Sequence, residues 1–428
     1  MDPRDAIQDD LLERARQLAR NGVREVLIQL PTGGGKGVMI TKATTRCVAA
    51  CKRALVIVPL IVLAEDMHRR HLQAGIRAGL VQADNNTDPD AWIQIATMQT
   101  LAQMSPRPAA DLVIVDEARH AASDKLRALL AEYQGANMLG FDATPERQDG
   151  KPLGDIFRAI VQGPSVKELQ RLGALVPCEV LALADKTRQL AADPIEAYLR
   201  HTPNTRAIVF ASDVAHASEI EQRATAEGLT AAVIVGTTSR RERERLLNLD
   251  PQIIVGVGVM REGWDRPQVE TVVLARAFDH VSGWLQCIGR GLRIHPGKTR
   301  CTVLDLAGSV HLLGLPDEDR TWHLEGAAAR RTENALVIRR CLECGCVYRE
   351  AAVCPRCGAT ASRARKVKRV LSAAERMSRI EAVEDPVERD KKRFAALVKQ
   401  AFSWAPPGRA THIARAQFVK KYGRAAPL

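Results

Sequence analysis

The chain is poor in aromatic residues and has none of the long apolar segments that membrane proteins need. Phe, Trp and Tyr make up 4% of its 428 residues, whereas hydrophobic residues make up 46%, so aliphatic side chains must fill its core. Because no run of about 18 apolar residues occurs, the sequence predicts no membrane-spanning helix. The first ten residues, MDPRDAIQDD, lack the basic start and apolar core of a secretory signal. We therefore expect a cytoplasmic protein with no membrane partner.

Apolar runs of strand length alternate with amphipathic helical segments in two successive series. The first series is VLIQL, ALVIV, IQIAT, DLVIVD and NMLGF, and the second is VLALA, AIVFAS, AAVIVG, QIIVGVGV, TVVLAR and TRCTVLDLAG. This alternation is typical of parallel sheets covered by helices on both faces. We predict two tandem α/β domains over residues 1–160 and 161–320. A segment from about 146 to 176, with Gly and Pro residues and one helix, is expected to join them.

Ten cysteines are present, and five of them fall within the segment CLECGCVYREAAVCPRCG. Cys341 and Cys344 form one C-x2-C pair, Cys354 and Cys357 form another, and a glycine follows each pair. Two turns of this kind place four thiolates around a tetrahedral Zn²⁺, which predicts a zinc ribbon. Cys346 is either a spare residue or an alternative ligand. The other five cysteines lie in apolar or helical surroundings and are expected to be buried without chemistry.

Positive charge is concentrated at the end of the chain, beyond the ribbon, which we place at residues 335–362. The formal net charge is +12, and residues 363–428 contain 17 Lys and Arg against 6 Asp and Glu. A localised basic region favours a polyanionic partner such as nucleic acid, although a solvated helical surface has the same composition. We expect a basic helical tail whose aromatic residues form the core of a small bundle rather than stack on bases. These residues are Phe394, Phe402, Trp404, Phe418 and Tyr422.

A glycine-rich loop, PTGGGKG, follows the first apolar run and opens a helical segment from about Lys36 to Cys51. In this context the backbone N–H groups of a turn and of a helix N-terminus converge on a phosphate group. The lysine of such a loop reaches the β and γ phosphates of a nucleotide. The predicted nucleotide-binding residues of the loop are Thr32, Gly33, Gly34, Gly35, Lys36 and Gly37.

A second motif, DLVIVDEARH, places two acidic residues at the end of an apolar run. Ligands gather at this position in an open α/β sheet. Asp116 can hold Mg²⁺ through its water shell, and Glu117 can orient and deprotonate an attacking water. Together with the loop, these acids predict a nucleoside triphosphate site.

Eight segments, taken in order, resemble the motifs of the superfamily 2 helicases and translocases. Within that superfamily they are similar to the DEAD/DEAH-like group related to restriction-enzyme translocases of bacteria and phages. The segments are PTGGGKG, VPLIVLAEDM, IATMQTLAQ, DEARH and FDATPER in the first domain, and RAIVFAS, REGWDRP and QCIGRGLR in the second. The resemblance covers about residues 1–312. It implies two RecA-like domains with ATP and Mg²⁺ bound in the cleft between them.

The resemblance also implies that the second domain completes the ATP site. Arg290 and Arg293 are spaced i and i+3 on an expected helix, and Gln286 lies one turn earlier on the same face. The two guanidinium groups would stabilise charge on the γ phosphate, so that hydrolysis depends on closure of the cleft. Asp265 is similar to a residue that contacts the ribose or couples the two sites.

Five further residues match family positions for adenine and nucleic acid. Arg4 and Gln8 resemble the element that reads adenine. Thr97, Gln99 and Arg261 resemble contacts to a nucleic-acid backbone, and such contacts carry little sequence information.

Three positions depart from the family pattern. Gly37 replaces the hydroxyl residue that binds Mg²⁺, Arg119 stands where His or Asp is usual, and Asp142 stands where Ser or Thr is usual. Because the last two positions touch one another in the family, we expect an ion pair between Arg119 and Asp142. In the alternative, Asp142 faces Lys36 or the metal. The residues expected to couple the second and third motifs are Arg119, His120, Asp142 and Thr144.

These features predict an ATP-driven motor that acts on DNA rather than RNA, with the ribbon and the tail as accessory modules that bind DNA or a protein partner. Gly37 leaves open a protein that has lost hydrolysis and serves as a nucleic-acid clamp, unless a water takes the vacant metal position. An RNA helicase is a third possibility, since both substrates are gripped through phosphates. We find no nuclease or methyltransferase motif in the sequence.

Overall fold

The computed structural model describes residues 3–82, 85–121, 123–147, 149–182, 190, 192–258, 266–325, 338–349, 351–360, 364–367 and 416–417. The chain divides into two units, residues 1–370 and 371–428. The aromatic residues of the predicted tail bundle lie outside the described residues. Among the helices that the structure describes, none is both long and apolar enough to cross a bilayer.

The first domain is built on an eight-stranded sheet. Its strands are β1 (Glu25–Gln29), β2 (Ala54–Val58), β3 (Gly79–Gln82), β4 (Asn85–Asn86), β5 (Ile93–Thr97), β6 (Leu112–Asp116), β7 (Asn137–Asp142) and β8 (Ala159–Gln162). They lie in the order β4-β3-β5-β2-β6-β7-β1-β8. Neighbours are parallel except for the antiparallel pair β3 and β4. The carboxyl ends of β1 and β6 therefore lie at the same edge of the sheet.

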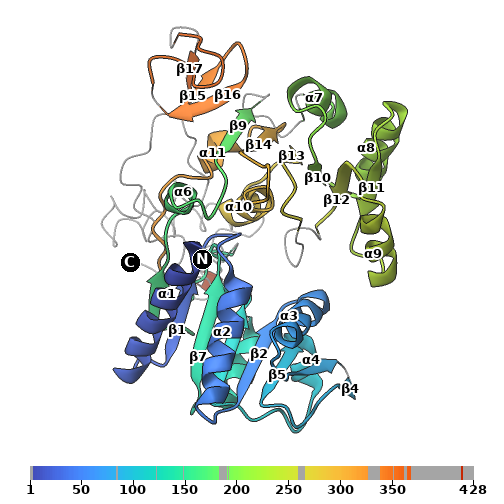
Figure 1. Ribbon diagram of the computed structural model, residues 1–428. Helices are drawn as coiled ribbons and strands as arrows, with labels where there is room; N and C mark the ends of the chain where they lie inside the picture. Colours follow the sequence, from blue (N-terminus) through green and yellow to red (C-terminus); the bar gives the residue numbers. More distant parts are fainter. Residues whose placement is uncertain are drawn as a thin grey trace, which may run out of the picture. The chain divides into compact units, whose positions relative to one another are not determined.

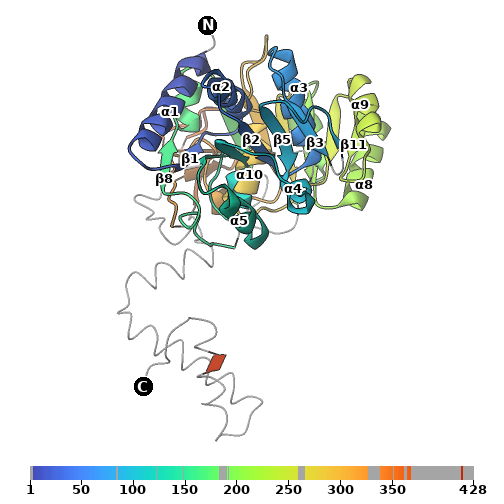
Figure 2. The same ribbon diagram turned by 90° about the horizontal axis from the view of Figure 1, so that it is seen from below.

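Helices cover both faces of this sheet, which is why its central strands are apolar throughout. The helices are α1 (Pro3–Arg20), α2 (Lys36–Ala49), α3 (Ile61–Gln73), α4 (Met98–Gln103) and α5 (Asp124–Leu130). Helices α1, α2 and α3 lie on one face, and α4 and α5 lie on the other (Figure 2). All five residues of β2, ALVIV, are buried between these layers.

The second domain is built on a nine-stranded sheet. Its strands are β9 (Cys178–Ala182), β10 (Ala207–Ala211), β11 (Ala231–Ile234), β12 (Ile253–Gly256), β13 (Thr271–Ala275), β14 (Cys301–Asp305), β15 (Ile338–Cys341), β16 (Cys346–Arg349) and β17 (Ala364–Val367). The order is β11-β12-β10-β13-β14-β9-β16-β15-β17. Strands β9 to β14 are parallel, whereas β15, β16 and β17 join antiparallel at the β9 edge. Figure 1 shows these last three strands in orange beside β9.

The helices of the second domain follow the same alternation with the parallel strands. They are α6 (Val166–Arg171), α7 (Pro194–His201), α8 (Val214–Ala226), α9 (Arg240–Asn248), α10 (Val281–Gly289) and α11 (Val310–Leu313). The α/β class with two parallel-sheet domains is thus confirmed.

Three details differ from the sequence prediction. Strand β8 lies in the segment that we expected to be only a connection, and it forms an edge of the first sheet. The ribbon strands extend the second sheet and do not form a separate sheet. The first described residues of the predicted helical tail, Ala364–Val367, form strand β17.

After the parallel strands of the second domain the chain returns to the first. We call residues 314–325 the return segment. The Trp322 amide donates to Gln162 Oε1 at 3.0 Å, and the Leu324 carbonyl accepts from the amides of Leu153 and Gly154 at 2.7 and 2.9 Å. The Leu324 side chain is buried in the core of the first domain. The first domain therefore includes residues that lie beyond the parallel strands of the second domain in the sequence.

Candidate active site

A pocket of about 400 Å³ lies where the glycine-rich loop faces α10 and the chain that follows it. Residues from both domains line it, as an inter-domain nucleotide site requires. The predicted site residues among its lining are Arg4, Gln8, Thr32, Gly33, Gly35, Lys36, Gly37, Asp116, Glu117, Arg290 and Arg293. The lining also contains Asp5, Asp66 and Arg70, which the sequence analysis did not identify because only the tertiary fold brings them to the loop.

Contacts from α1 hold the loop after β1 in its conformation. Gly35 is the N-cap of α2 with φ 92° and ψ 32°, and a Cβ atom there would lie 2.3 Å from Gln8 Nε2. Only glycine satisfies both constraints. Gln8 Nε2 donates to the Gly34 carbonyl at 3.2 Å, and Arg4 Nη1 donates to the Gly33 carbonyl at 3.4 Å. These contacts fix the shape of the loop.

Gln8 has one atom that these contacts do not use. Its side chain is buried, and within the described residues Oε1 has no hydrogen-bond partner. A buried acceptor without a partner costs about 1–3 kcal/mol. An exocyclic amino group of a nucleobase would satisfy it, so the chemistry fits adenine.

The two acids lie at the end of β6, as predicted. Asp116 is the last residue of the strand, and its Oδ1 accepts from the Glu117 amide at 3.0 Å. Burial and, next, the charge of Glu117 raise the pKa of Asp116 to about 7, against the opposing effect of the charge of Lys36. A carboxyl group poised in this way binds a divalent cation in place of its proton. The donor set therefore fits Mg²⁺.

A buried ionic network links the second and third motifs. Arg119 Nη1 lies 2.9 Å from Asp142 Oδ1 and also donates to Glu117 Oε2. Asp142 Oδ2 accepts from the Arg119 amide at 2.7 Å, and Oδ1 accepts from the Thr144 amide at 2.8 Å. The expected ion pair between Arg119 and Asp142 is confirmed. Both carboxylate oxygens of Asp142 are thus engaged by Arg119 and Thr144.

The second domain joins this network through α10. The Gln286 amide oxygen, oriented toward the guanidinium, accepts from Arg119 Nη2 and Nη1 at 2.6 and 2.8 Å. In the opposite orientation the amide nitrogen lies 3.3 Å from Glu117 Oε2. Thr144 Oγ1 lies 2.7 Å from Ser282 Oγ, also across the cleft. Ser282 was not identified from the sequence, which contains no local signal for it.

The prediction that one helical face carries Arg290 and Arg293 is wrong. Helix α10 ends at Gly289, Arg290 is its C-cap, and Arg293 forms an isolated antiparallel bridge with Leu175. The glycines at 289 and 291 weaken the helix at this point. Both arginines nevertheless line the pocket, because the turn after the helix brings Arg293 to the same side.

The remaining predicted residues have different environments. Thr97 is buried, and its side chain caps α4 by accepting from the Thr100 amide at 3.1 Å, which accounts for a threonine there. Gln99 and His120 are exposed. Arg261 and Asp265 lie outside the described residues.

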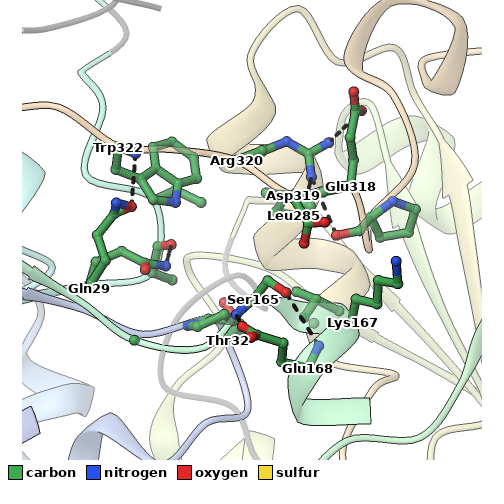
Figure 3. A pocket seen from close by; sticks show the side chains of 18 of the residues that line it. Gln29, Thr32, Ser165, Lys167, Glu168, Leu285, Glu318, Asp319, Arg320 and Trp322 are labelled. Atoms are coloured by element: carbon green, nitrogen blue, oxygen red, sulfur yellow. Dashed lines mark hydrogen bonds and ion pairs between the residues drawn. The ribbon is translucent and has the colours of Figure 1, made fainter. Parts of the chain in front are cut away.

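A second cavity, of about 580 Å³, is bounded by the return segment and α10 (Figure 3). Thr32 and Leu285 contribute to its lining, as do Arg320 and Trp322 of the return segment. Arg320 Nη2 donates to the carbonyls of Leu313 and Leu315 at 2.9 and 2.8 Å. This guanidinium therefore stabilises the conformation of the return segment. Neither the loop lysine nor the two motif II acids line the cavity. It is therefore distinct from the candidate nucleotide pocket.

The four predicted zinc ligands come together at one end of the ribbon strands. The sulfurs of Cys341, Cys344, Cys354 and Cys357 lie within 4.8 Å of one another. The Cys341–Cys357 and Cys344–Cys354 sulfur distances are 3.6 and 3.7 Å. Tetrahedral Zn²⁺ with Zn–S bonds of about 2.3 Å places sulfurs about 3.8 Å apart, so the cluster fits this metal.

Cys346 is not part of the cluster. It is buried in β16, where it pairs with Leu181 of β9, and burial raises the pKa of its thiol to about 12. The odd cysteine is therefore a core residue of the sheet.

Comparisons with family models match the two domains separately. The model described as type III restriction enzyme, res subunit, matches residues 2–147. The helicase conserved C-terminal domain matches residues 191–295. The two matches occur in the same order as the two sheets and include the loop, the motif II acids and the two arginines.

Individual relatives are distant. A 51.5 kDa protein of a Lactococcus phage is 22% identical over 88% of this chain and 85% of its own length. A Saccharomyces cerevisiae protein assigned by name to the ATP-dependent helicases, IRC3, is 22% identical over 71% of this chain, and the match spans about half, 51%, of the yeast protein.

Two solved structures have a similar fold. A Vibrio vulnificus fragment assigned to the HsdR subunits of type I restriction enzymes has a TM-score of 0.57 at 21% identity, covering 72% of this chain and 65% of that one. The S. cerevisiae protein Dbp5, bound to RNA and ADP BeF3, has a TM-score of 0.53 at 17% identity, covering 73% and 88%. At these identities the similarity concerns the fold alone.

Proposed function

Since the chain belongs to the superfamily 2 helicases, we propose that it hydrolyses ATP between its two domains and uses the resulting domain movement to travel along DNA. The observation that carries the proposal is one pocket lined by Lys36, Asp116 and Glu117 of the first domain and by Arg290 and Arg293 of the second. A site completed from both domains makes hydrolysis depend on how they are positioned.

Each residue has a distinct part in the proposed reaction. Lys36 binds the β and γ phosphates, and Asp116 holds Mg²⁺, which when bound supplies neutralising charge. Glu117 orients the attacking water and accepts its proton. Arg290 and Arg293 stabilise the charge that develops on the transferred phosphoryl group. Gln286 contacts Arg119, which in turn contacts Glu117, and so couples the position of the second domain to Glu117.

The choice of DNA rests on the match to a restriction-enzyme family and on the basic composition of residues 363–428. Backbone contacts of the type expected for Gln99 and Arg261 do not by themselves distinguish DNA from RNA. We further propose that the four-cysteine cluster binds Zn²⁺, because its sulfur distances match that ion.

Steady-state ATP hydrolysis tests the proposal with single-stranded DNA, duplex DNA and RNA as separate additions. We expect DNA to stimulate hydrolysis in the native chain and Lys36→Ala to abolish it. Lys52→Ala, at an exposed position just beyond α2, is the matched control. Stimulation by RNA alone would replace the DNA proposal with an RNA helicase.

The alternative is a clamp that binds nucleic acid without hydrolysis. Gly37 favours it, because the loop lacks the metal-binding hydroxyl. In that case every nucleic acid would bind without stimulating hydrolysis in the native chain, and Lys36→Ala would leave binding unchanged.

A further inference from the structure

The space beside Gly37 is occupied by a side chain from another helix. Gly37 is the second residue of α2, and Arg70 lies in the last turn of α3. A Cβ atom at position 37 would lie 3.3 Å from Arg70 Nε and 3.5 Å from Arg70 Cζ. The guanidinium group thus lies beside the position from which a serine or threonine would project its hydroxyl.

Arg70 also faces the nucleotide pocket. It lines the same pocket as Lys36, Asp116 and the two arginines of the second domain. Its Nη2 lies 3.7 Å from Asp66 Oδ2, and the two side chains are 38% and 40% exposed. A partly exposed ion pair at this distance is worth about 0–1 kcal/mol. Asp66 therefore does not prevent the guanidinium from binding a phosphate.

We propose that Arg70 is a phosphate-binding residue that compensates for the missing hydroxyl at Gly37. A guanidinium group binds phosphate oxygens in bidentate geometry and carries its charge at every physiological pH. In this loop, part of the charge neutralisation would come from α3 rather than from a fully coordinated Mg²⁺. ATP binding should then depend strongly on Arg70 and less on the metal. This inference rests on the proposed ATP site.

A double-mutant cycle on Gly37 and Arg70 tests the inference by equilibrium binding of a fluorescent ATP analogue, with Mg²⁺ and with EDTA. We expect Arg70→Ala to weaken binding about 10- to 100-fold, the range for a hydrogen bond to a charged group, in both conditions. Arg70→Lys should recover part of the loss. Adenosine, which has no phosphate, should bind the native chain and Arg70→Ala equally. Thermal unfolding of each variant shows whether it is folded.

The Gly37 variants of the cycle show whether Arg70 compensates for the missing hydroxyl or only fills the space beside Gly37. Gly37→Thr alone should weaken binding, because a Cβ atom 3.3 Å from Arg70 Nε requires the guanidinium group to move. Gly37→Thr combined with Arg70→Ala should restore binding with Mg²⁺ but not with EDTA, because the metal then has its hydroxyl ligand. Arg69→Ala is the matched control, since Arg69 pairs with Asp66 at 3.4 Å, is 52% exposed and is not among the described residues that line the pocket.

Three outcomes would overturn the inference. If Arg70→Ala binds the analogue like the native chain while Lys36→Ala does not, Arg70 only fills space. If the loss in Arg70→Ala appears equally for adenosine, Arg70 supports the pocket wall and does not bind phosphate. If Lys36→Ala also binds normally, the ATP site itself is misplaced, and the inference fails together with the proposed function.

Discussion

Arg119 and Asp142 form an ion pair of 2.9 Å in which both side chains are buried. In the family pattern that the sequence resembles, the first position is His or Asp and the second is Ser or Thr, so both partners depart from that pattern. The pair connects η1 (Ala118–His120), which follows Glu117, to the end of β7. A buried charge that loses its partner lowers the free energy of unfolding. The presence of either residue therefore requires the other.

Replacing one partner should therefore lower the free energy of unfolding more than replacing both. We expect Arg119→His to destabilise the protein by about 3–5 kcal/mol, because Asp142 keeps its charge without the guanidinium. Adding Asp142→Ser should recover more than half of the loss, and chemical denaturation measures both. Additive losses in the double variant would show that the two residues are not coupled.

Gln8 should determine the preference for adenine. Its buried Oε1 has no partner among the described residues, so removal of the amide costs ATP an interaction that inosine triphosphate, whose base has no exocyclic amino group, does not make. We expect Gln8→Ala to weaken ATP binding about 10-fold and the binding of inosine triphosphate much less. Competition binding measures the ratio, and Gln17→Ala, exposed on the same helix, is the control. An unchanged ratio of the two nucleotide affinities would show that Gln8 does not contact the base.

Removal of zinc should destabilise the second domain as well as the ribbon. Strand β16 pairs with β9, Arg349 Nη1 lies 2.9 Å from Asp317 Oδ2, and Arg356 Nε lies 3.6 Å from Glu179 Oε2. Chelation should lower the thermal midpoint by about 5–10 °C, which corresponds to about 2–4 kcal/mol for a domain of this size.

Metal content distinguishes ligands from core cysteines in the same experiment. Cys344→Ser should lose the zinc, whereas Cys346→Ala should retain one zinc per chain because Cys346 belongs to the sheet. A midpoint that does not move on chelation would mean that the ribbon folds independently of the metal.

Leu324 should stabilise a domain from which it is remote in sequence. We expect Leu324→Ala to cost about 2–4 kcal/mol, the range for a buried leucine. Leu342→Ala, at a position that is 62% exposed, should change the stability by less than about 0.5 kcal/mol. Equal effects in denaturation would show that the return segment is not part of the core.

The features predicted well are those with a local signal. The run ALVIV gave β2 at its observed bounds, Ala54–Val58, because a strand buried on both faces is apolar throughout. Lys36, Asp116 and Glu117 were located because a loop before a helix and acids after a strand occupy fixed positions in this fold.

The features missed depend on contacts between distant segments. Strand β8 is a four-residue edge strand, mostly half-buried, and its sequence resembles a connection. The contact between Gly37 and Arg70 joins two helices, so neither residue indicates the other in the sequence. The end of α10 was misplaced because helical spacing was extended through Gly289 and Gly291.

The return segment also affects the order in which the chain folds during synthesis. Domains generally fold from the N-terminus as they leave the ribosome. Here the amides of Leu153 and Gly154 donate to the Leu324 carbonyl. Leu324 is synthesised only after all the parallel strands of the second sheet. The first domain is therefore completed only after the parallel strands of the second domain have been made. A ribosome stalled within those strands holds a nascent chain whose nucleotide-binding domain is still unfinished.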